Sequence, residues 1–278
     1  ISMIRELLEW KFRRQRVGFV PTMGALHAGH LSLIEEARKH CDHVIVSIFV
    51  NPTQFNKSAD LENYPKTEYE DIALLVESGA HLAYLPGLKE VYPEGYSQPY
   101  YELGALESVM EGSHRPGHFQ GVAAVLDRFF QDVAPDMAFF GEKDYQQLAV
   151  VRQLVRLRQF PIEIIGCPTL REDHGLAMSS RNMRLSTDAF KRAGIIHEGL
   201  TNLQKAFGKT ADAKLLEETI AQWNEQADFE TEYLTLARAD NFQSPQNGED
   251  LSRHDWRLFT AVNVEGVRLI DNLPLRPE

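Results

Sequence analysis

The stretch VGFVPTMGALHAGHLSLIEEARKH, residues 17–40, joins a short apolar run, a turn with two glycines and an amphipathic segment. The run over 17–20 predicts a buried strand. From Leu31 to the end of the stretch, Leu31, Ile34 and Ala37 recur at the spacing of one helix face, and charged residues occupy the other, so this part predicts a helix. A strand that leads through a turn into a helix is the opening of a βαβ unit.

The same alternation of short apolar runs and longer amphipathic runs continues to about residue 170. Residues 44–50 form a continuous run rich in β-branched residues, which is typical of a strand buried in a parallel sheet. Residues 87–121 are dense in Pro, Gly, Tyr and Glu without a clear period, so we expect loops and short elements there. The other predicted elements are helices over 68–78, 121–132 and 146–159 and strands over 81–85, 137–140 and 162–166.

The pattern changes after residue 186, where helical segments are followed by strands. The predicted elements there are helices over 187–206 and 211–226, a strand over 232–236, and a hairpin over 257–264 and 267–270. Alternating strands and helices favour a parallel sheet, whereas separate runs of helices and strands favour an α+β unit. We therefore predict an α/β fold: a Rossmann-like parallel sheet domain over 1–169 and a smaller C-terminal α+β domain over 170–278.

Composition limits the class of protein. The chain has 278 residues, of which 43% are apolar and 25% charged, so it can bury a full core. Its most apolar run, 44–50, is far shorter than the roughly 20 residues that cross a bilayer. Residues 1–16 lack the apolar core of a secretory signal, and Cys41 and Cys167 are too few for a disulfide framework, so we expect a cytoplasmic protein without membrane contacts. The net charge of -11 would repel nucleic acid.

Polar segments follow four of the five strands predicted in the first domain. In open parallel sheets, ligands bind beyond the carboxyl ends of the strands, so we expect these segments to converge at one edge of the sheet. They are residues 21–30 after the first strand, 51–55 after the second, 141–147 after the fourth, and 168–171 running on to 178–182 after the fifth.

His27 and His30 lie three residues apart at a helix start, so both can face the same way beside free N–H groups that suit phosphate. Gly24 and Gly29 remove side chains where a nucleotide would approach the backbone. Such histidines can donate hydrogen bonds to phosphate oxygens during displacement at phosphorus. Two other interpretations stay open: ordinary surface histidines, or a metal-binding pair, for which the sequence offers neither the adjacent Glu of zinc proteases nor an obvious third ligand.

Lys143 is a cation able to neutralise transferring phosphates. Its neighbours Glu142 and Asp144 could position it or hold Mg²⁺ together with nucleotide oxygens. A Lys-Asp pair by itself is more often a solvated surface feature. The chemistry therefore depends on where the fold places these residues.

Ser179, Ser180 and Arg181 offer two hydroxyls and a guanidinium, which also suit phosphate, although such a triplet alone is usually a loop or a helix cap. Gln54 and Gln147 carry neutral amides that bind hydroxyl and carboxylate groups without adding a charge to the site. Each signal is weak alone, and their combination in this order is specific.

In this order the motifs resemble the pantothenate synthetase family, the pantoate:β-alanine ligases of coenzyme A synthesis. That family belongs to the nucleotidyltransferase superfamily, which includes class I aminoacyl-tRNA synthetases. There, a His-x-Gly-His turn binds phosphate, as in His27 to His30, and Met178 to Arg181 resembles the Lys-Met-Ser-Lys-Ser loop. The resemblance runs from about Arg5 to Asn272, and its most specific stretches are 21–33, 46–55, 115–121, 139–147 and 175–182.

The resemblance implies a two-step reaction at one site that the C-terminal domain covers. The carboxylate of (R)-pantoate attacks the α-phosphorus of ATP, which gives a bound pantoyl adenylate and pyrophosphate. The amine of β-alanine then attacks the acyl carbon and expels AMP. The resemblance also implies Mg²⁺ and a homodimer.

The resemblance also assigns roles to matching positions. His30 would be the general acid, with His27 and Lys143 on the phosphates, and Asp144 is a candidate Mg²⁺ ligand. The positions implied for ATP are Met23, Gly24, Ala25, Leu26, His27, Ala28, Gly29, His30, Gly141, Glu142, Lys143, Asp144, Leu170, Met178, Ser179, Ser180 and Arg181. Those implied for pantoate and β-alanine are Gln54, Gln147, Asn51, Tyr64, Arg115 and His118.

Three alternatives share parts of this pattern. Another adenylyltransferase of coenzyme biosynthesis would keep the histidines but would need basic residues for a phosphorylated substrate where Gln54 and Gln147 stand. A catalytically silent nucleotide sensor would bind ATP without turnover, and the presence of His27, His30 and Lys143 argues against it. A tRNA synthetase is disfavoured by the small size and the acidic balance of the chain.

Overall fold

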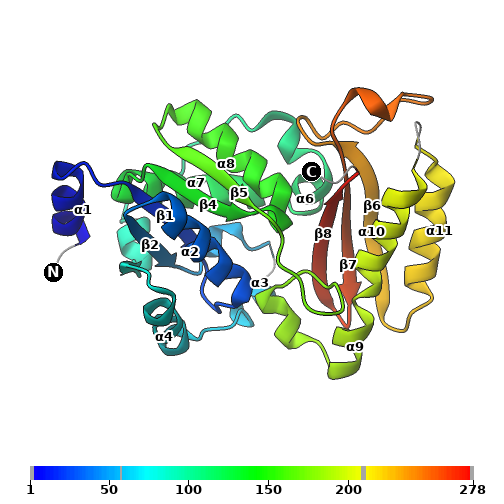
Figure 1. Ribbon diagram of the computed structural model, residues 1–278, viewed down its shortest axis with the longest axis horizontal. Coiled ribbons are helices and arrows are strands. Elements are labelled where there is room, and N and C mark those ends of the chain that lie inside the picture. Colours follow the sequence, from blue (N-terminus) through cyan, green and yellow to red (C-terminus); the bar gives the residue numbers. More distant parts are fainter. Residues whose placement is uncertain (1–2, 57, 208–210, 276–278) are drawn as a thin grey trace. The chain divides into compact units, whose positions relative to one another are not determined.

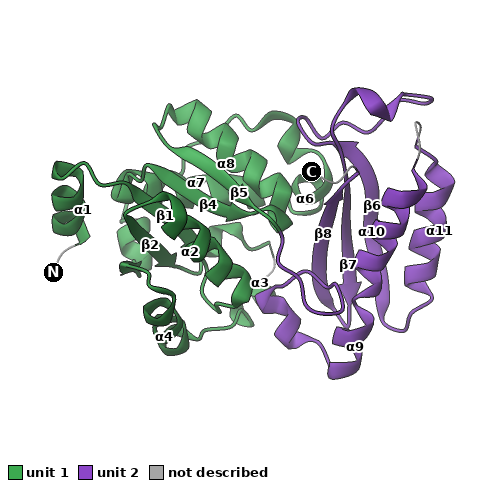
Figure 2. Cartoon of the chain, viewed as in Figure 1, with its two compact units in different colours: residues 1–168 green, residues 169–278 purple. Residues whose placement is uncertain are grey.

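The computed structural model describes residues 3–56, 58–207 and 211–275. The chain divides into two compact units, residues 1–168 and 169–278 (Figure 2). Each unit has its own sheet and its own hydrophobic core.

The first unit is built on a five-stranded sheet whose strand pairs are all parallel, in the order β3-β2-β1-β4-β5 (Figure 1). The chain winds from β1 to one side through β2 and β3, then returns to the other side of β1 through β4 and β5. This order creates a topological switch point between β1 and β4, where ligands bind in open parallel sheets. The strands are β1 (Val17–Thr22), β2 (His43–Ile48), β3 (Leu82–Tyr84), β4 (Met137–Gly141) and β5 (Glu163–Cys167).

Helices pack on both faces of this sheet. Consecutive residues of β1 point to opposite faces: Phe19 belongs to a core cluster with Phe129 and Leu148, and Val20 belongs to another with Ile34. The parallel, doubly covered sheet confirms the predicted α/β class. The main helices are α1 (Met3–Phe12), α2 (Ala28–His40), α4 (Glu68–Ser78), α7 (His118–Val133) and α8 (Tyr145–Arg158).

Short elements occupy the loops, as expected for residues 87–121. Helix α7 begins at His118, three residues before the predicted start at 121. No helix in the described parts of the chain is both long and apolar enough to span a membrane. The short elements are α3 (Ser58–Glu62), α5 (Leu88–Val91), α6 (Met110–His114) and the 3₁₀ turns η1 (Pro52–Gln54), η2 (Gly104–Glu107) and η3 (Glu142–Asp144).

The second unit contains an antiparallel sheet in the order β6-β7-β8, with helices packed against it. The predicted hairpin is present, and Glu265 and Gly266 at its turn both have positive φ, 49° and 74°, as a two-residue type I′ turn requires. The elements are η4 (Ser180–Arg184), α9 (Thr187–Arg192), α10 (Ile195–Ala206), α11 (Ala213–Asn224), β6 (Phe229–Arg238), η5 (Leu251–Arg253), β7 (Trp256–Val264) and β8 (Val267–Pro274).

The single helix predicted over 187–206 is wrong. Helix α9 ends at Arg192 and α10 begins at Ile195. Between them, a Cβ on Gly194 would fall well inside van der Waals contact of the backbone carbonyl oxygen of His174. The backbone there passes a neighbouring segment at a distance that only glycine allows, while Ala193 and Gly194 keep right-handed helical dihedral angles.

Candidate active site

The turn after β1 is held by hydrogen bonds between side chains and the backbone. The hydroxyl of Thr22 donates to the carbonyl of Ser47 at 2.6 Å and accepts from the N–H of Gly24 at 3.2 Å. Gly24 has φ +80°, and Ala25 after it also has a positive φ of 49°. Positive φ is costly for a residue with a side chain, so the turn at Ala25 needs support from outside. The carboxylate of Asp71 on α4 accepts from Ala25 N–H at 2.9 Å and from Leu26 N–H at 2.7 Å.

His27 and His30 form a reciprocal cap at the start of α2. The Nδ1 atom of His27 accepts from Gly29 N–H at 3.1 Å, and Nδ1 of His30 accepts from His27 N–H at 3.3 Å. Their ring centroids lie 4.1 Å apart. The first turn of α2 carries no acidic residue, so the positive end of the helix is available to an anion.

Burial and the positive charge of Lys143 together lower the pKa of His27 to about 4. Burial, with smaller contributions from His27 and Lys143, lowers the pKa of His30 to about 3. Both imidazoles are therefore neutral at pH 7. A neutral imidazole carries one N–H, and Nδ1 of each ring is an acceptor, so we assign the hydrogen to Nε2 in both. The pair consequently offers two neutral Nε2–H donors.

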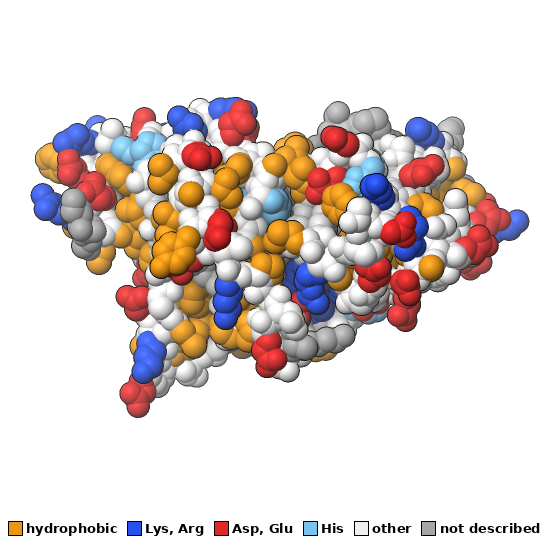
Figure 3. All heavy atoms as spheres, turned by 90° about the horizontal axis from the view of Figure 1, so that it is seen from below, with side chains coloured by type: hydrophobic (Ala, Val, Ile, Leu, Met, Phe, Trp, Pro, Cys, Tyr) orange, Lys and Arg blue, Asp and Glu red, His pale blue; other side chains and the backbone are white. Residues whose placement is uncertain are grey.

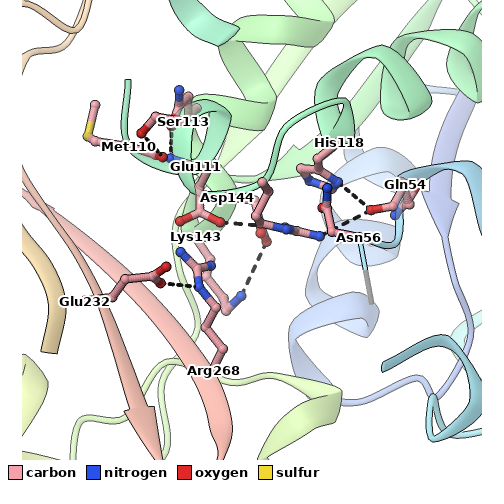
Figure 4. A network of polar contacts seen from close by, with 12 residues as sticks. Gln54, Asn56, Met110, Glu111, Ser113, His118, Lys143, Asp144, Glu232 and Arg268 are labelled. Carbon is pink, nitrogen blue, oxygen red and sulfur yellow. Dashed lines mark hydrogen bonds and ion pairs between the residues drawn. The ribbon is translucent and has the colours of Figure 1, made fainter. Parts of the chain in front are cut away.

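Lys143 follows β4, on the other side of the switch point from the histidine turn. Its Nζ lies 3.4 Å from Oδ2 of Asp144, and its side chain is 18% exposed (Figure 4). The two strands that precede these segments, β1 and β4, are neighbours in the sheet, and the positive charge of Lys143 lowers the pKa of both histidines. The sequence-predicted residues of β1 and β4 thus come together.

Asn51 and Gln54 follow β2 and are both buried. The Nδ2 of Asn51 donates to Oε1 of Gln54 at 3.1 Å and to the carbonyl of Gly121 at 3.1 Å. The Nε2 of Gln54 lies 2.9 Å from Sδ of Met23, which connects this segment to the histidine turn. Tyr64 is buried with its ring edge against Phe55, 5.7 Å between centroids.

His118 and Arg115 act on the backbone of Gln54. Nδ1 of His118 is 2.8 Å from the carbonyl oxygen of Gln54, and Nη2 of Arg115 is 3.4 Å from the same oxygen (Figure 4). A carbonyl can only accept, so His118 carries its hydrogen on Nδ1. Burial lowers the pKa of His118 to about 3, so it too is neutral at pH 7.

The two glutamines at the start of α8 differ. Gln146 is buried, with its Oε1 accepting from Glu111 N–H at 3.0 Å and its Nε2 donating to the carbonyls of Leu106 and Val109, both at 2.9 Å. Gln147 is only partly buried. The structure therefore uses Gln146 to hold the 106–111 segment and leaves Gln147 as the candidate for substrate.

In the second unit, the segment from Leu170 to Met178 folds back on itself, and Met178 N–H donates to the Leu170 carbonyl at 3.0 Å. Arg171, near the start of this segment, anchors it through a bidentate ion pair with Asp271 at 2.6 and 3.0 Å. Ser179 then caps η4, accepting from Arg181 N–H at 3.3 Å. Ser180 is buried, and Arg181 is partly buried. These sequence-predicted residues form one ordered segment within their own unit.

The sequence profile of the family described as pantoate-beta-alanine ligase matches residues 1–274. The chain belongs to the pantoate-beta-alanine ligase family. Pantothenate synthetase of Ruegeria sp. strain TM1040 is 49% identical over 268 residues, 95% of this chain and 93% of that protein. The enzyme of Cereibacter sphaeroides strain ATCC 17029 is 47% identical over 270 residues, 96% of this chain and 94% of that protein.

Solved structures agree with this assignment. Pantothenate synthetase of Thermus thermophilus has a TM-score of 0.90 at 41% identity and covers 100% of this chain and 99% of its own. Pantoate-beta-alanine ligase of Francisella tularensis, complexed with βγ ATP and β-alanine, has a TM-score of 0.78 at 33% identity and covers 100% and 97%. The predicted family and its class of enzyme are thereby confirmed.

Sequence reasoning missed Asp71, the carboxylate that supports the histidine turn of this pantoate-beta-alanine ligase family member. A signal was present, because Asp71 lies four residues before Leu75 and shares the buried face of α4 with it. A charged side chain on the buried face of a helix needs partners, and these partners come from a distant segment.

Proposed function

We propose that this chain condenses (R)-pantoate with β-alanine to pantothenate at the expense of ATP, through a pantoyl adenylate, releasing AMP and pyrophosphate. The observation that carries the proposal is the pair of neutral histidines and Lys143, in the segments that follow the two strands flanking the switch point, in a chain matched by this ligase family over residues 1–274. The alternative adenylyltransferase is not favoured, because it would need cations where Gln54 and Gln147 stand.

In the first step, a carboxylate oxygen of pantoate bonds to the α-phosphorus of ATP as the bond to the bridging oxygen breaks, and pyrophosphate leaves. In the second step, the amine of β-alanine attacks the acyl carbon, loses a proton and expels AMP. Adenylation is needed because a free carboxylate is a poor acyl donor. A site that excludes water protects the adenylate from hydrolysis.

His27 and His30 stabilise the charge that builds on the phosphates in the first step. Because both are neutral at pH 7 with Nε2 protonated, they act as preorganised hydrogen-bond donors. This role refines the general-acid assignment of His30 implied by the family resemblance, since little imidazolium is present at neutral pH. Lys143 supplies the fixed positive charge.

The nucleotide enters as its Mg²⁺ complex. Mg²⁺ keeps several waters and takes one or two carboxylates together with phosphate oxygens. The described residues contain no cluster of three or more His, Cys, Asp or Glu side chains able to hold a metal by themselves. Asp144, next to the phosphate-binding Lys143, fits the part of a single carboxylate ligand to a nucleotide-bound ion.

Neutral amides recognise the other substrates. Gln54 and Gln147 bind the hydroxyl and carboxylate groups of pantoate, and Gln54 also lies near the β-alanine site. Asn51 and Tyr64 shape that end, and Arg115 and His118 hold the Gln54 backbone in place. Supporting this, Asn51 fixes the orientation of the Gln54 carboxamide by donating to its Oε1.

For the nucleotide, Met23 to His30 and Gly141 to Asp144 contact the ribose and phosphates. Leu170 and Met178 lie against adenine, and Ser179, Ser180 and Arg181 contact the phosphates. The hydrogen bond between Leu170 and Met178 keeps these two apolar residues adjacent, as a binding surface for a base requires.

We also propose a cytoplasmic homodimer whose partners are its small-molecule substrates. The net charge of -11 and the interspersed acidic and basic side chains in Figure 3 are unfavourable for a polyanion. Sedimentation of the purified protein tests the dimer.

The direct test is release of AMP and pyrophosphate by the purified protein with MgATP and (R)-pantoate, with and without β-alanine. We expect AMP in step with the pantoate-β-alanine amide, and only when both substrates are present. Pyrophosphate without amide under the full conditions would point to a different acceptor. ATP binding without any turnover would favour a nucleotide sensor.

A further inference from the structure

Asp71 is a carboxylate that contacts the histidine turn from another part of the chain. It is 2% exposed and lies on α4, between β2 and β3 in the sequence. Its two oxygens accept from the consecutive N–H groups of Ala25 and Leu26, at 2.9 and 2.7 Å. The hydroxyl of Thr67 donates to Oδ1 at 3.3 Å. All the described polar contacts of Asp71 are thus made to this turn or to its own helix.

These contacts hold a backbone conformation that is unfavourable alone. Gly24 and Ala25 have consecutive positive φ angles, +80° and 49°, which turn the next N–H groups toward one point. Successive N–H groups arranged in this way form a concavity that binds an anion. The carboxylate of Asp71 supplies the anion, and without it two largely buried donors would lose their acceptor.

The backbone conformation of this turn sets the positions of His27 and His30. His27 follows Leu26, its own N–H donates to Nδ1 of His30, and its Nδ1 accepts from Gly29 N–H. A rotation of the 25–26 peptides would move His27 N–H away from His30 and release both ring nitrogens. The tautomer of both rings therefore depends on the backbone that Asp71 holds.

We propose that Asp71 is a positioning residue for adenylation: it fixes the 24–27 backbone so that His27 and His30 keep Nδ1 as acceptor and Nε2–H as donor. This inference rests on the proposed function. Asp71 contacts none of the substrates in this proposal and acts through the turn alone. A close fit supports it, because a Cβ on Gly24 would lie 2.9 Å from Oδ2 of Asp71.

A purely structural carboxylate would behave differently, and the same unit contains one for comparison. Asp127 on α7 is 4% exposed and accepts from the Tyr101 hydroxyl at 2.8 Å and from Nε of Arg158 at 2.9 Å. No described hydrogen bond of Asp127 reaches the histidine turn. It also accepts from Nε2 of Gln131 at 3.1 Å, so it matches Asp71 in burial and in having three hydrogen-bond partners, and Asp127→Asn is the matched control.

The experiment compares Asp71→Asn with Asp127→Asn in single-turnover pyrophosphate release from MgATP and (R)-pantoate. Asparagine keeps the shape of the side chain but turns a donor toward one of the two N–H groups. The amplitude reports the folded fraction, and the rate constant reports the geometry of the site. For Asp71→Asn we expect a rate constant about 10²-fold lower at near-normal amplitude, the loss expected from a displacement of about 1 Å. Asp127→Asn should lower the melting temperature and leave the rate constant unchanged.

The ring nitrogens give a readout that needs no activity. In ¹⁵N NMR spectra, His27 and His30 of the unaltered protein should show protonated Nε2 and unprotonated Nδ1, and Asp71→Asn should show a mixture. If the unaltered protein forms no pyrophosphate, the proposed function fails, and the NMR comparison alone decides the role of Asp71. An unchanged rate constant together with unchanged tautomers would make Asp71 a structural residue only.

A gentler variant covers the case in which Asp71→Asn does not fold. Thr67 is the N-cap residue of α4, but its side chain makes no capping hydrogen bond, so Thr67→Val removes only the donor to Asp71. We expect a smaller loss of rate in the same direction. If Asp71→Asn does not fold and Thr67→Val changes neither the rate constant nor the tautomers, the proposal is overturned.

Discussion

At the scale of single residues, three neutral histidines of the first unit differ in which ring nitrogen carries the hydrogen. His27 and His30 accept at Nδ1 from backbone N–H groups, whereas His118 donates from Nδ1 to a carbonyl. The hydrogen-bond partner decides the tautomer of each ring. In the proposed mechanism the first two rings present Nε2–H to the phosphates, whereas the third holds the carbonyl of Gln54. The sequence could indicate that these histidines matter, but not which nitrogen each one offers.

His30→Ala should slow adenylation by about 10²-fold or more, because it removes a donor to the developing charge on the phosphates. Single-turnover pyrophosphate release measures this rate. His40→Ala is the control, since His40 lies on the exposed end of the same helix with Glu36 as its partner at 3.0 Å. A near-normal rate in His30→Ala would remove this side chain from the mechanism.

Lys143→Ala should weaken MgATP binding and slow adenylation, and it should also raise the pKa of His27 and of His30. The sign follows because the positive charge of Lys143 disfavours protonation of both rings. NMR titration gives the pKa values, and Lys89→Ala at an exposed position is the control for the loss of one charge. Unchanged nucleotide affinity, turnover and histidine pKa values would contradict the assigned position of Lys143.

At the scale of elements, helix α4 begins and ends at the predicted residues, but the helix predicted over 187–206 is broken at Gly194. The difference has a physical reason. Helical periodicity and the Gly79 end of α4 are local signals, whereas the residues between α9 and α10 pack against the His174 backbone, which comes from another segment. Sequence patterns therefore predict where a helix lies, but they do not show which of its residues pack against a distant segment of the backbone.

The contact between α7 and η1 leads to a prediction about Gly121. A Cβ on this residue would fall well inside van der Waals contact of the Thr53 carbonyl oxygen, and the Gly121 carbonyl accepts from Asn51. Gly121→Ala should therefore destabilise the protein by about 1–3 kcal/mol, as overpacking does, and should raise KM for pantoate by displacing Gln54. Chemical denaturation and steady-state kinetics measure the two effects. Equal stability and equal KM would show that α7 can move away freely.

At the scale of the whole molecule, each unit has its own sheet and its own core, and the predicted fold class holds for both. The strand order of the first unit could not be read from the sequence, because apolar runs show that strands are buried but not which strands are neighbours. That order places the histidine turn and Lys143 at the switch point.

Stability should fall as the pH drops below neutrality. In the native state the pKa values are about 4 for His27 and about 3 for His30 and His118, against about 6.5 for unfolded histidine. Below about pH 6.5 the unfolded chain binds protons that the native protein does not, so the free energy of unfolding decreases down to about pH 4. Urea denaturation between pH 7 and pH 5 measures it.

The control for this prediction is His118→Gln, which removes one of the three groups and should reduce the slope of stability against pH. Each buried neutral histidine contributes at most about 1.4 kcal/mol per pH unit within the window. A stability that is flat between pH 7 and pH 5 would mean that the three histidines take up protons in the folded protein as readily as in the unfolded chain.

The sequence by itself determined the alternation of strands and helices, the two-part organisation and the position of two histidines in the turn from strand to helix, because these follow from local periodicity and from residue types a few positions apart. Only the tertiary structure decided the strand order, the separate uses of Gln146 and Gln147, the break at Gly194 and the support of the turn by Asp71. Asp71 and Ala25 are 46 positions apart in the chain. Their hydrogen bond exists because packing of α4 brings a buried carboxylate to two backbone donors, and no local pattern specifies that approach.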